Sequence, residues 1–385
     1  MRLLFFHNGA DLYGASRSFL RLNSRLVRDG VVVKAVLPQE GPLLDSLRHA
    51  GVDVEVMRPF PVIERSAFKS LGGLVRLIVN TPVSVVQIMR MIGEFRPDAV
   101  HSNLSVLFTP ALAARLKRVP HIWHIRETYA EFGFFWKLYQ RFMAWGADCV
   151  VAVSTPIANQ FGGTRRKKVK VIYNGFPLSE FEAVPDERVQ AFKNRFDLKG
   201  ELLVGLVGRI KFVRKGQEYL VEAVAQLKDR FPNVKCLLVG SPFPGNESHW
   251  TRLQELIREL GVEDRIICTG DVEDIKAAYS AFDISVMASG LPEPFGGVTI
   301  ESMALGKPVV GTNIGGTVEQ IEDGVTGILV PPRDSKALAD ALATLLGDKS
   351  LCEQMGRSGR QRFEDNFEFE PFYEKIRQVY NEVCA

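Results

Sequence analysis

One stretch constrains the fold of this chain more than any other, residues 283–317 (DISVMASGLPEPFGGVTIESMALGKPVVGTNIGGT). It opens with Ile284–Met287, a short and partly β-branched apolar run that is typical of a buried parallel strand. A loop rich in proline and glycine follows, and residues 298–305 then have the composition of a short helix. Gly306 stands where a left-handed C-cap is expected, and Pro308 prevents the helix from continuing. Because two valines then begin another strand, the stretch predicts a strand–loop–helix–strand unit of an α/β protein.

The loop and helix of this unit suit an anionic ligand. A glycine loop between strand and helix directs free backbone N–H groups and the positive helix end at an anion, usually a phosphate. Two carboxylates, Glu293 on the loop and Glu301 in the first turns of the helix, have seven residues between them, so both can face one ligand from its two ends. A phosphate site between two carboxylates fits a nucleotide sugar. The alternative is that Glu301 is an acidic residue favoured near a helix N-terminus and Glu293 a solvated loop charge.

The whole string, rather than the spacing of the two glutamates, carries a family resemblance. Glu293-Pro294-Phe295-Gly296-Gly297 through Glu301, then A-x-G-x-P-V-V and the pair Gly315-Gly316, resembles the retaining glycosyltransferases of family GT4. The resemblance implies a GT-B fold, in which two Rossmann-like, doubly wound parallel-sheet domains face a cleft. It covers most of the second half of the chain and the first half only loosely.

Length and composition are consistent with such a protein. A chain of 385 residues is too long for one compact core, so two domains are expected. We expect an N-terminal acceptor-binding domain over 1–178, a C-terminal donor-binding domain over 195–362, and a final helix over 363–385 that packs back on the first domain. The net charge of +3 gives no case for nucleic acid, and five scattered cysteines without C-x-x-C spacing favour a reducing, cytoplasmic compartment.

The first domain shows repeated strand–helix units, the pattern of a parallel doubly wound sheet. In its first loop only Gly14 matches a glycine pair that the family carries, and Gly14 is either a donor-phosphate contact or a simple turn glycine. By resemblance, His124 contacts the donor sugar, because the family has a histidine at the end of the corresponding strand. The acidic residue that commonly follows is displaced to Glu127. A metal cluster of His101, His121 and His124 is disfavoured because no carboxylate set stands nearby.

Residues 62–96 combine basic side chains, among them Arg65, Lys69 and Arg76, with many aliphatic ones. A basic amphipathic segment of this kind can lie on an anionic membrane surface. A pair of amphipathic helices packed on the sheet is the slightly favoured interpretation. The aromatic run of residues 129–145 is likewise interpreted as a packed helix. Because no uninterrupted run reaches the roughly 18 to 20 apolar residues of a membrane span, we expect a soluble or peripheral protein, at most attached to the inner face of the membrane.

The second domain carries cations that suit a diphosphate. Gly208-Arg209 and Lys215-Gly216 resemble the family pattern G-R-x-x-x-x-K-G, although five residues separate Arg209 and Lys215 here. By resemblance both bind the diphosphate, and Arg214 competes for the role of Lys215. The alternative is two exposed cations. The loop Gly270-Asp271-Val272 offers backbone groups to the base in the family.

The resemblance implies a metal-independent, retaining transfer of a hexosyl group, since no D-x-D motif is present. The donor is a UDP- or GDP-sugar, without a further cofactor, and the acceptor is a glycan or lipid-linked molecule of cell-surface polysaccharide or glycolipid biosynthesis. Alternatives are a nucleotide-sugar epimerase of the same fold and a non-catalytic nucleotide-sugar-binding subunit. The implied catalytic residues are Glu293, His124, Arg209 and Lys215; the implied donor-binding residues are Gly14, Gly208, Arg209, Lys215, Gly270, Val272, Glu293, Phe295, Gly296, Gly297, Val298, Thr299 and Glu301.

Overall fold

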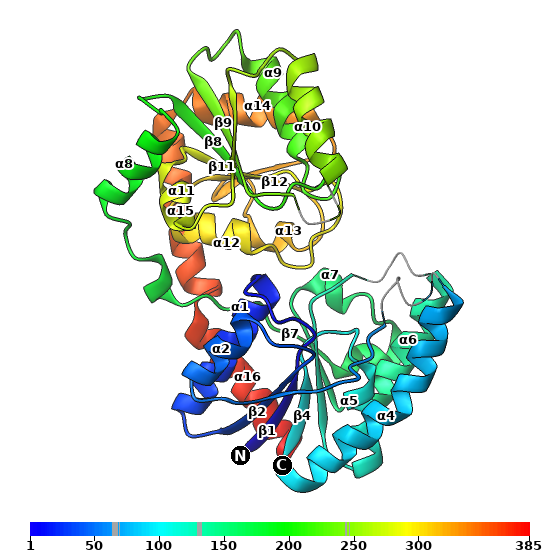
Figure 1. The fold of residues 1–385 in the computed structure, drawn as a ribbon. Helices are drawn as coiled ribbons and strands as arrows, with labels where there is room; N and C mark the ends of the chain where they lie inside the picture. The colour runs from blue at the N-terminus through cyan, green and yellow to red at the C-terminus, as the bar shows by residue number, and fades with distance from the viewer. Residues whose placement is uncertain (64–67, 69, 129–132, 243–244, 246) are drawn as a thin grey trace. The chain divides into compact units, whose positions relative to one another are not determined.

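The computed structural model describes residues 1–63, 68, 70–128, 133–242, 245 and 247–385. The chain forms two compact units (Figure 1). The first consists of Met1–Gly175 together with Glu370–Ala385, and the second of Phe176–Phe369. The expected boundary at residue 363 falls inside a helix that ends at Asn366, and the final helix begins at Phe369.

The first unit is built on a parallel sheet of seven strands in the order β3-β2-β1-β4-β5-β6-β7. Its strands are β1 (Arg2–Phe6), β2 (Val32–Leu37), β3 (Asp53–Val56), β4 (Ala99–Ser102), β5 (His121–Ile125), β6 (Cys149–Ala152) and β7 (Val169–Val171). Its helices are α1 (Gly14–Arg28), α2 (Pro42–His49), α4 (Leu71–Phe95), α5 (Phe108–Lys117), α6 (Gly133–Gly146), α7 (Thr155–Ala158), the 3₁₀ segment η2 (Gly163–Lys168) and α16 (Phe369–Cys384).

Successive side chains of β1 point to opposite faces of this sheet, and both faces are covered. Leu4 and Phe6 pack in one core with residues of α4 and α5. Phe5 faces the other way and contacts Phe19 of α1 and Tyr380 of α16. Figure 1 shows α1, α2 and α16 on one side of the strands and α4 and α5 on the other. Because both faces are buried at the centre of the sheet, β1 is a nearly continuous apolar run, whereas β3 at the edge alternates charged and apolar residues.

The second unit contains a parallel sheet of six strands in the order β10-β9-β8-β11-β12-β13. Its strands are β8 (Leu202–Val207), β9 (Val234–Val239), β10 (Ile266–Gly270), β11 (Ile284–Met287), β12 (Val309–Thr312) and β13 (Gly327–Val330). Its helices are η3 (Leu178–Phe181), α8 (Asp186–Arg195), α9 (Gln217–Leu227), α10 (Glu247–Glu259), α11 (Ile275–Ala281), α12 (Gly297–Ala304), α13 (Thr317–Gln320), α14 (Ser335–Leu346) and α15 (Lys349–Asn366). The predicted pair of doubly wound parallel sheets is confirmed.

Each sheet reverses its strand order at one point. In the first unit the chain winds outward through β2 and β3 and then returns to add β4 beside β1. In the second it winds through β9 and β10 and returns to add β11 beside β8. The loops that leave the two central strands diverge at such a switch point, and ligands of doubly wound proteins bind in the crevice between them.

The predicted local structure of residues 283–317 is largely confirmed. β11 is completely buried, and α12 begins one residue before the predicted start and ends one residue before the predicted end. Gly306 follows α12 with φ +69°, the left-handed conformation expected of its C-cap position. β12 then begins at Val309.

The region around residues 62–96 differs from the expectation of two packed helices. Residues 64–67 and 69, including Arg65 and Lys69, lie outside the described residues. Leu71–Phe95 form the single helix α4 of 25 residues, and only its C-terminal half is buried. By length and composition α4 is the one helix in the described part of the chain that could cross a membrane; its best window has mean hydropathy 1.4 and is 17% buried. In the aromatic run 129–145, residues 129–132 are likewise not described, and α6 begins at Gly133.

Candidate functional site

The candidate site lies at the switch point of the second unit, at the carboxyl ends of β8 and β11. β8 is followed by Gly208 and Arg209, and β11 by the loop that carries Glu293. The two strands are neighbours in the sheet although β9 and β10 separate them in the sequence. This strand order brings together the two predicted groups of site residues, the cations after β8 and the carboxylates after β11.

An ion pair joins the two loops. The Lys215 ammonium lies 3.0 Å from Oε1 of Glu293, and the two side chains are 26% and 12% exposed. Ser289 Oγ donates a second hydrogen bond to the same carboxylate oxygen at 3.3 Å. The Glu293 carboxylate is therefore nearly buried and is fixed by Lys215 and Ser289. Its interpretation as a solvated loop charge is wrong. Arg214, the competitor of Lys215, makes no ion pair with Glu293; Lys215 alone of the two does so.

Glycines allow the backbone segments of this site to pack directly on one another. A Cβ at Gly315 would lie 2.5 Å from the carbonyl oxygen of Glu293, and a Cβ at Gly316 would lie 2.4 Å from that of Pro294. Gly316 N donates to the Glu293 carbonyl at 2.7 Å. On the other loop, Gly216 has φ +70°, and a Cβ there would lie 1.9 Å from the carbonyl oxygen of Ala288. The loop geometry that places Glu293 therefore requires glycine at these positions.

The loop between Arg209 and Lys215 accommodates its extra residue in an unusual conformation. Val213 has φ +60°, which is strained for a β-branched residue. Its N–H donates to the Glu218 carboxylate, and its carbonyl accepts from Gly290 N at 2.7 Å. The aliphatic chain of Lys215 passes over Gly208, with Cδ 3.7 Å from the position of a Cβ. These bonds fix the loop after β8 to the loop after β11.

The α12 N-terminus completes the site. Its N-cap is Gly296, which provides no side-chain cap, and no acidic residue stands in its first turn. The N–H groups of Gly297, Val298 and Thr299 therefore have no partner within the helix, and their contact with an anion stays a prediction. Thr299 Oγ1 is buried without a hydrogen-bond partner. Phe295, just before the N-cap, is 9% exposed and packs its ring near that of Phe367.

The second carboxylate is held by a tyrosine. Glu301 is the fifth residue of α12, half-buried, and outside the first turn. Oη of the buried Tyr279, on α11, donates to Glu301 Oε2 at 2.8 Å. A preference for acidic residues in the first turn therefore does not explain Glu301.

The predicted base loop lies farther along the same edge. Gly270, at the end of β10, has φ +69°, and its carbonyl accepts from Gly240 N at 2.9 Å. Asp271 Oδ1 accepts from Ser241 N at 3.1 Å. Val272 packs against the core under α8 and α11. The contact of this loop with a base stays a prediction.

The two predicted residues of the first unit have contrasting environments. Gly14 is the exposed first residue of α1, and a Cβ added there would meet nothing within 4 Å. His124 is completely buried within β5, where its ring lies 5.6 Å from that of His101 and neither ring nitrogen has a hydrogen-bond partner. Burial lowers the pKa of His124 well below its ordinary value. His124 is the penultimate residue of β5, near the carboxyl end of the strand, but its ring is buried inside the unit; its sugar contact stays a prediction.

Sequence reasoning missed a polar network at the switch point of the first unit. Asn103 Nδ2 donates to His7 Nδ1 at 3.0 Å, across the ends of β1 and β4. His7 Nε2 then donates to Ser16 Oγ at 3.0 Å. Arg126, after β5, donates from Nε to Asn103 Oδ1 at 3.1 Å and from Nη1 to Asn174 Oδ1. The available signal was position, since His7, Asn103 and Arg126 each follow directly after a strand.

Burial shifts the charges of this network. It lowers the pKa of His7 to about 4, so this imidazole is neutral at pH 7. It also lowers the pKa of Arg126 to about 10, which leaves the guanidinium charged. Arg126 Nη2 has no hydrogen-bond partner. The positive charge of Arg126 is buried in this network beside the carboxylate of Glu127, which accepts from Arg126 N at 3.0 Å.

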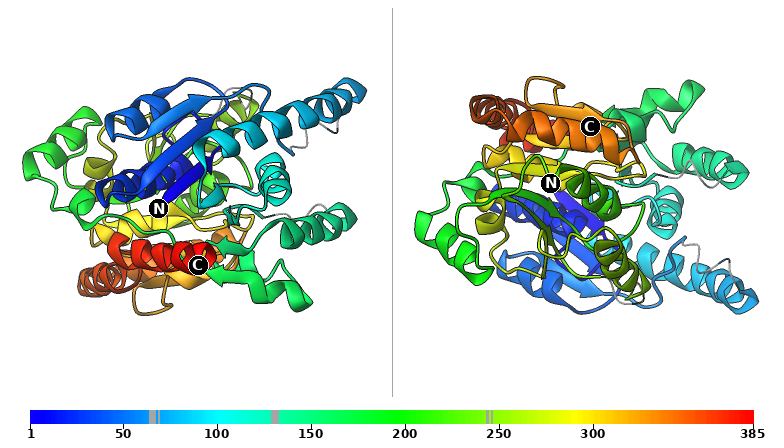
Figure 2. Two further views of the ribbon diagram at one scale, coloured as in Figure 1. Left: turned by 90° about the horizontal axis from the view of Figure 1, so that it is seen from below. Right: turned by 90° about the horizontal axis from the view of Figure 1, so that it is seen from above.

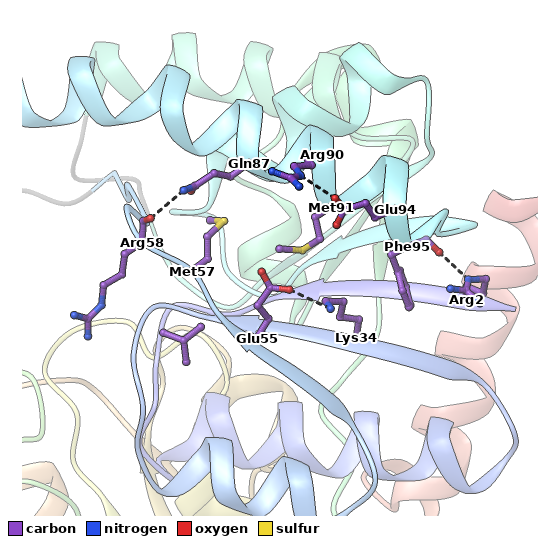
Figure 3. A pocket seen from close by; sticks show the side chains of 11 residues that line it. Arg2, Lys34, Glu55, Met57, Arg58, Gln87, Arg90, Met91, Glu94 and Phe95 are labelled. Carbon is purple, nitrogen blue, oxygen red and sulfur yellow. Dashed lines mark hydrogen bonds and ion pairs between the residues drawn. The ribbon is translucent and has the colours of Figure 1, made fainter.

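A separate cavity of about 520 Å³ lies between β1, β2, β3 and the C-terminal half of α4 (Figure 3). Its charged side chains are already satisfied: Lys34 pairs with Glu55 at 3.0 Å, Arg90 with Glu94 at 2.8 Å, and Arg2 Nε donates to the Phe95 carbonyl. No predicted site residue lines it. Among the described residues, no group of three His, Cys, Asp or Glu side chains is arranged to hold a metal ion.

Comparison with known protein families divides the chain in the same way as the two units. Residues 13–175 match the glycosyl transferase 4-like domain, and residues 188–362 match the glycosyl transferases group 1 family. All predicted donor-site residues of the second unit lie within the second match.

Curated relatives match mainly over part of their length. D-inositol 3-phosphate glycosyltransferase of Nocardia farcinica is 34% identical over 217 residues, which cover 54% of this chain and 47% of the relative. The capsular polysaccharide biosynthesis glycosyltransferase CapM of Staphylococcus aureus is 28% identical, covering 61% of this chain and 62% of the relative. The match thus spans about half the length of the first of these relatives.

Solved structures match over the whole chain. Anabaena Alr3699/HepE in complex with UDP superposes with a TM-score of 0.85 and 26% identity, covering 100% of both chains. The same protein in complex with UDP-glucose gives a TM-score of 0.84 and 25% identity, again over 100% of both chains. A glycosyltransferase from Rickettsia africae gives 0.86 and 25%, over 100% of this chain and 98% of that one. With both halves matched by glycosyltransferase families and the full chain by these structures, the chain belongs to the GT4-type glycosyltransferases of GT-B fold.

Proposed function

We propose that this protein transfers a hexosyl group from a nucleotide sugar to a glycan or lipid-linked acceptor, with retention of the anomeric configuration and without a metal ion. The observation that carries the proposal is the Lys215–Glu293 pair at the switch point of the second unit, beside Arg209 and the uncapped N-terminus of α12. Alr3699/HepE, 26% identical and similar in fold over its full length, binds UDP and UDP-glucose. UDP is therefore the first nucleotide to test as a ligand, and GDP is the second.

The cations and the helix N-terminus have an electrostatic role. Arg209 presents a planar fork to phosphate oxygens and Lys215 a compact charge. Together with the N–H groups of α12 they stabilise the negative charge that develops on the diphosphate as its bond to the anomeric carbon breaks. Lys215 has three N–H donors, so it can keep one on Glu293 while it contacts a phosphate oxygen.

The two glutamates position the ends of the donor. Glu301, held by Tyr279, binds the ribose hydroxyls, and Glu293, held by Lys215 and Ser289, binds the sugar hydroxyls. In the transfer, the acceptor oxygen bonds to the anomeric carbon on the face that the diphosphate leaves. A phosphate oxygen of the leaving group takes the acceptor proton, so no protein nucleophile is consumed. Because the two glutamates fix the donor, the acceptor oxygen meets an anomeric carbon that is already oriented for the transfer.

The acceptor class and the cell compartment rest on wider observations. CapM is named for capsular polysaccharide biosynthesis, and the other relative for an inositol phosphate acceptor. We assign the protein to cell-surface polysaccharide or glycolipid biosynthesis on this basis. Its five cysteines are all free thiols, as a reducing cytoplasm favours.

The first test is thermal unfolding with UDP, GDP, ADP and dTDP, each alone and as its common sugar conjugate. A ligand that binds only the folded protein raises the melting temperature by mass action. At a ligand concentration 100 times the Kd, the free energy of unfolding increases by about 3 kcal/mol. One nucleotide should give a clear shift that Glu301→Ala abolishes. Glu263→Ala, at an exposed position of the same unit, should keep the shift. Equal shifts in both variants would contradict the assignment of Glu301.

A second measurement separates transfer from other chemistry. With the stabilising nucleotide sugar and an acceptor extract, NMR should show a product whose anomeric configuration is that of the donor. Interconversion of the free sugar nucleotide would instead indicate an epimerase. Donor binding with neither transfer nor donor hydrolysis would indicate a non-catalytic binding subunit.

A further inference from the structure

The N-terminal half of α4 carries apolar side chains that face solvent. Among the described residues, eight of the 19 large hydrophobic side chains that are exposed lie between Phe68 and Val86. The most exposed are Leu71 at 79%, Val86 at 65% and Ile78 at 62%. We call these residues the α4 apolar face: Phe68, Leu71, Leu74, Val75, Ile78, Val79, Val83 and Val86. Figure 2 shows α4 extending well beyond the strands of its unit.

This face is wider and longer than the one that α4 uses in the fold. Val85, Ile88 and Ile92 recur at helical spacing and are buried against the sheet and α5. Leu74 and Ile78 continue this stripe toward the N-terminus, where they are exposed, and Val75, Val79, Val83 and Val86 lie on another side of the helix. The N-terminal half of α4 therefore carries apolar side chains around much of its surface without a partner among the described residues of its unit. A contiguous exposed patch of this kind marks an interaction surface.

The neighbouring helix extends the face. The ring of Phe68 meets that of Phe135, in the first turns of α6, at a centroid distance of 5.5 Å. Phe135 is 36% exposed, and Leu138, one turn on, is 46% exposed.

The described charges around this face are basic. Between positions 70 and 93 the charged residues are Arg76 and Arg90, and Glu94 is the first acidic residue of α4. In the sequence, Glu64, Arg65 and Lys69 flank Phe68. On α6, Lys137 and Arg141 are exposed, and no acidic residue lies between 133 and 147. An apolar surface whose described charges are basic complements an anionic lipid layer.

A cavity of about 700 Å³ adjoins the first turns of α4. It is lined by Arg58 and Arg76, by Ser70, Gly72 and Gly73 at the start of the helix, and by the segment 59–62. Arg58 Nε donates to the Pro38 carbonyl at 3.3 Å, which leaves its Nη groups for a ligand. The Arg58 carbonyl is fixed by a hydrogen bond from Gln87 of α4 at 3.1 Å (Figure 3). Two guanidinium groups beside a helix N-terminus suit the phosphate of a lipid headgroup.

The length of the exposed segment excludes a membrane span. The exposed part of α4 before Ser84, which is buried, extends about 20 Å at 1.5 Å per residue, less than the roughly 30 Å hydrocarbon core. The rest of α4 belongs to the core of its unit and cannot enter a bilayer without unfolding it.

We propose that the α4 apolar face docks the first unit on an anionic phospholipid membrane, with the aliphatic side chains in the headgroup–acyl boundary and a lipid phosphate between Arg58 and Arg76. Docking would hold the unit at the surface where a lipid-linked acceptor resides. It does not depend on the donor site of the second unit.

The test is co-sedimentation of the full chain with vesicles of phosphatidylcholine alone and with 30% phosphatidylglycerol, a composition chosen to be about one-third anionic. Binding should require the anionic lipid and fall as salt is raised. The double substitution Ile78→Glu with Val79→Glu should lower the partition coefficient at least tenfold. Arg76→Glu should lower it at least fivefold, since each basic residue near the surface contributes about that factor. The matched control is Val318→Glu with Val325→Glu, two exposed valines of the second unit.

Two further readouts keep the outcomes separate. All variants should retain the thermal shift with the donor nucleotide, which shows that they are folded and that the donor site is unaffected. Sedimentation velocity without lipid reports self-association. Vesicle binding that is absent, equal for both lipid compositions, or unchanged in the Ile78/Val79 variant overturns the proposal. A dimer that the same variant dissociates, in a protein that does not bind vesicles, assigns the face to a second copy instead.

Discussion

Removing a single oxygen atom tests how the donor is held. Tyr279 is 1% exposed, and its hydroxyl donates to Glu301 at 2.8 Å, while its ring packs edge-to-face on Phe282. Tyr279→Phe deletes the hydrogen bond and keeps the ring. A hydrogen bond to a charged group contributes about 1.5–3 kcal/mol. Because Glu301 is half-buried and regains water, we expect the low end, about 1.5 kcal/mol, or a fall of about 3–6 °C in melting temperature.

The effect on the donor should be larger than this loss of stability suggests. Without the tyrosine, the Glu301 side chain recovers rotamer freedom that donor binding must remove again, at about 1–2 kcal/mol. We expect the Kd for the nucleotide, measured by isothermal titration calorimetry, to rise roughly tenfold. kcat should change little, since the groups that face the leaving diphosphate are intact.

A matched tyrosine provides the control. In the first unit, Tyr373 is fully buried and its hydroxyl donates to Asp29 at 2.7 Å. Tyr373→Phe removes the same kind of hydrogen bond and should cost similar stability without changing nucleotide affinity. If Tyr279→Phe leaves the Kd within twofold of the original while it lowers the melting temperature, Glu301 is not oriented for the donor and the reasoning fails.

Three other predictions follow from particular environments. Gly216→Ala should lower the free energy of unfolding by more than about 2 kcal/mol, because φ is +70° and the new methyl group would lie 1.9 Å from the Ala288 carbonyl oxygen; an unchanged urea midpoint would show that the loop can move. Gly14→Ala should leave stability within about 1 kcal/mol, since its Cβ would meet nothing within 4 Å, but it should weaken donor binding in calorimetry if the α1 N-terminus approaches the donor phosphate. Burial lowers the pKa of His7 and of His121 to about 4, so the unfolded chain binds their protons first as the pH falls below about 6.5, and stability is lost between there and pH 4. Urea unfolding at pH 5 should give a free energy at least about 4 kcal/mol below that at pH 7, about 2 kcal/mol from each of these two imidazoles and more from His101 and His124, whose pKa values burial also lowers. Equal values would show that these imidazoles are not held neutral.

The parts of the site that follow local rules were predictable from the sequence. β-branched residues, a proline–glycine loop and a left-handed glycine define β11, α12 and Gly306 within the single stretch 284–306. The same short stretch also led to the expectation that Glu293 and Glu301 bind a nucleotide sugar, which stays a prediction.

The partners of those residues were not predictable, because they depend on strand order. Lys215 and Glu293 are 78 positions apart and meet only because β11 is inserted beside β8. Tyr279 reaches Glu301 through the packing of α11 against α12, which no local pattern encodes. His124 shows another limit: every residue of β5 is buried, so the apolar pattern does not reveal which side chains reach the end of the sheet.

α4 shows a third limit. A charged residue, Arg76, and a proline, Pro82, interrupt its apolar run, so a count of consecutive apolar residues underestimates its hydrophobic character. Which of its apolar residues are buried and which are exposed also cannot be told without knowing where the sheet lies.

The division of the first unit between the two ends of the chain has a consequence for the order of folding. α16 supplies Tyr373, Ile376 and Tyr380, all completely buried, and Tyr380 Oη lies 2.9 Å from the ring of His101 in β4. A ribosome that has released residues 1–175 has therefore made the sheet of this unit but not the helix that covers one of its faces. The side of the sheet that α16 covers therefore stays exposed until the whole second unit has been synthesised. During that time it can bind chaperones or misfold. Vectorial synthesis thus completes the second unit before the first.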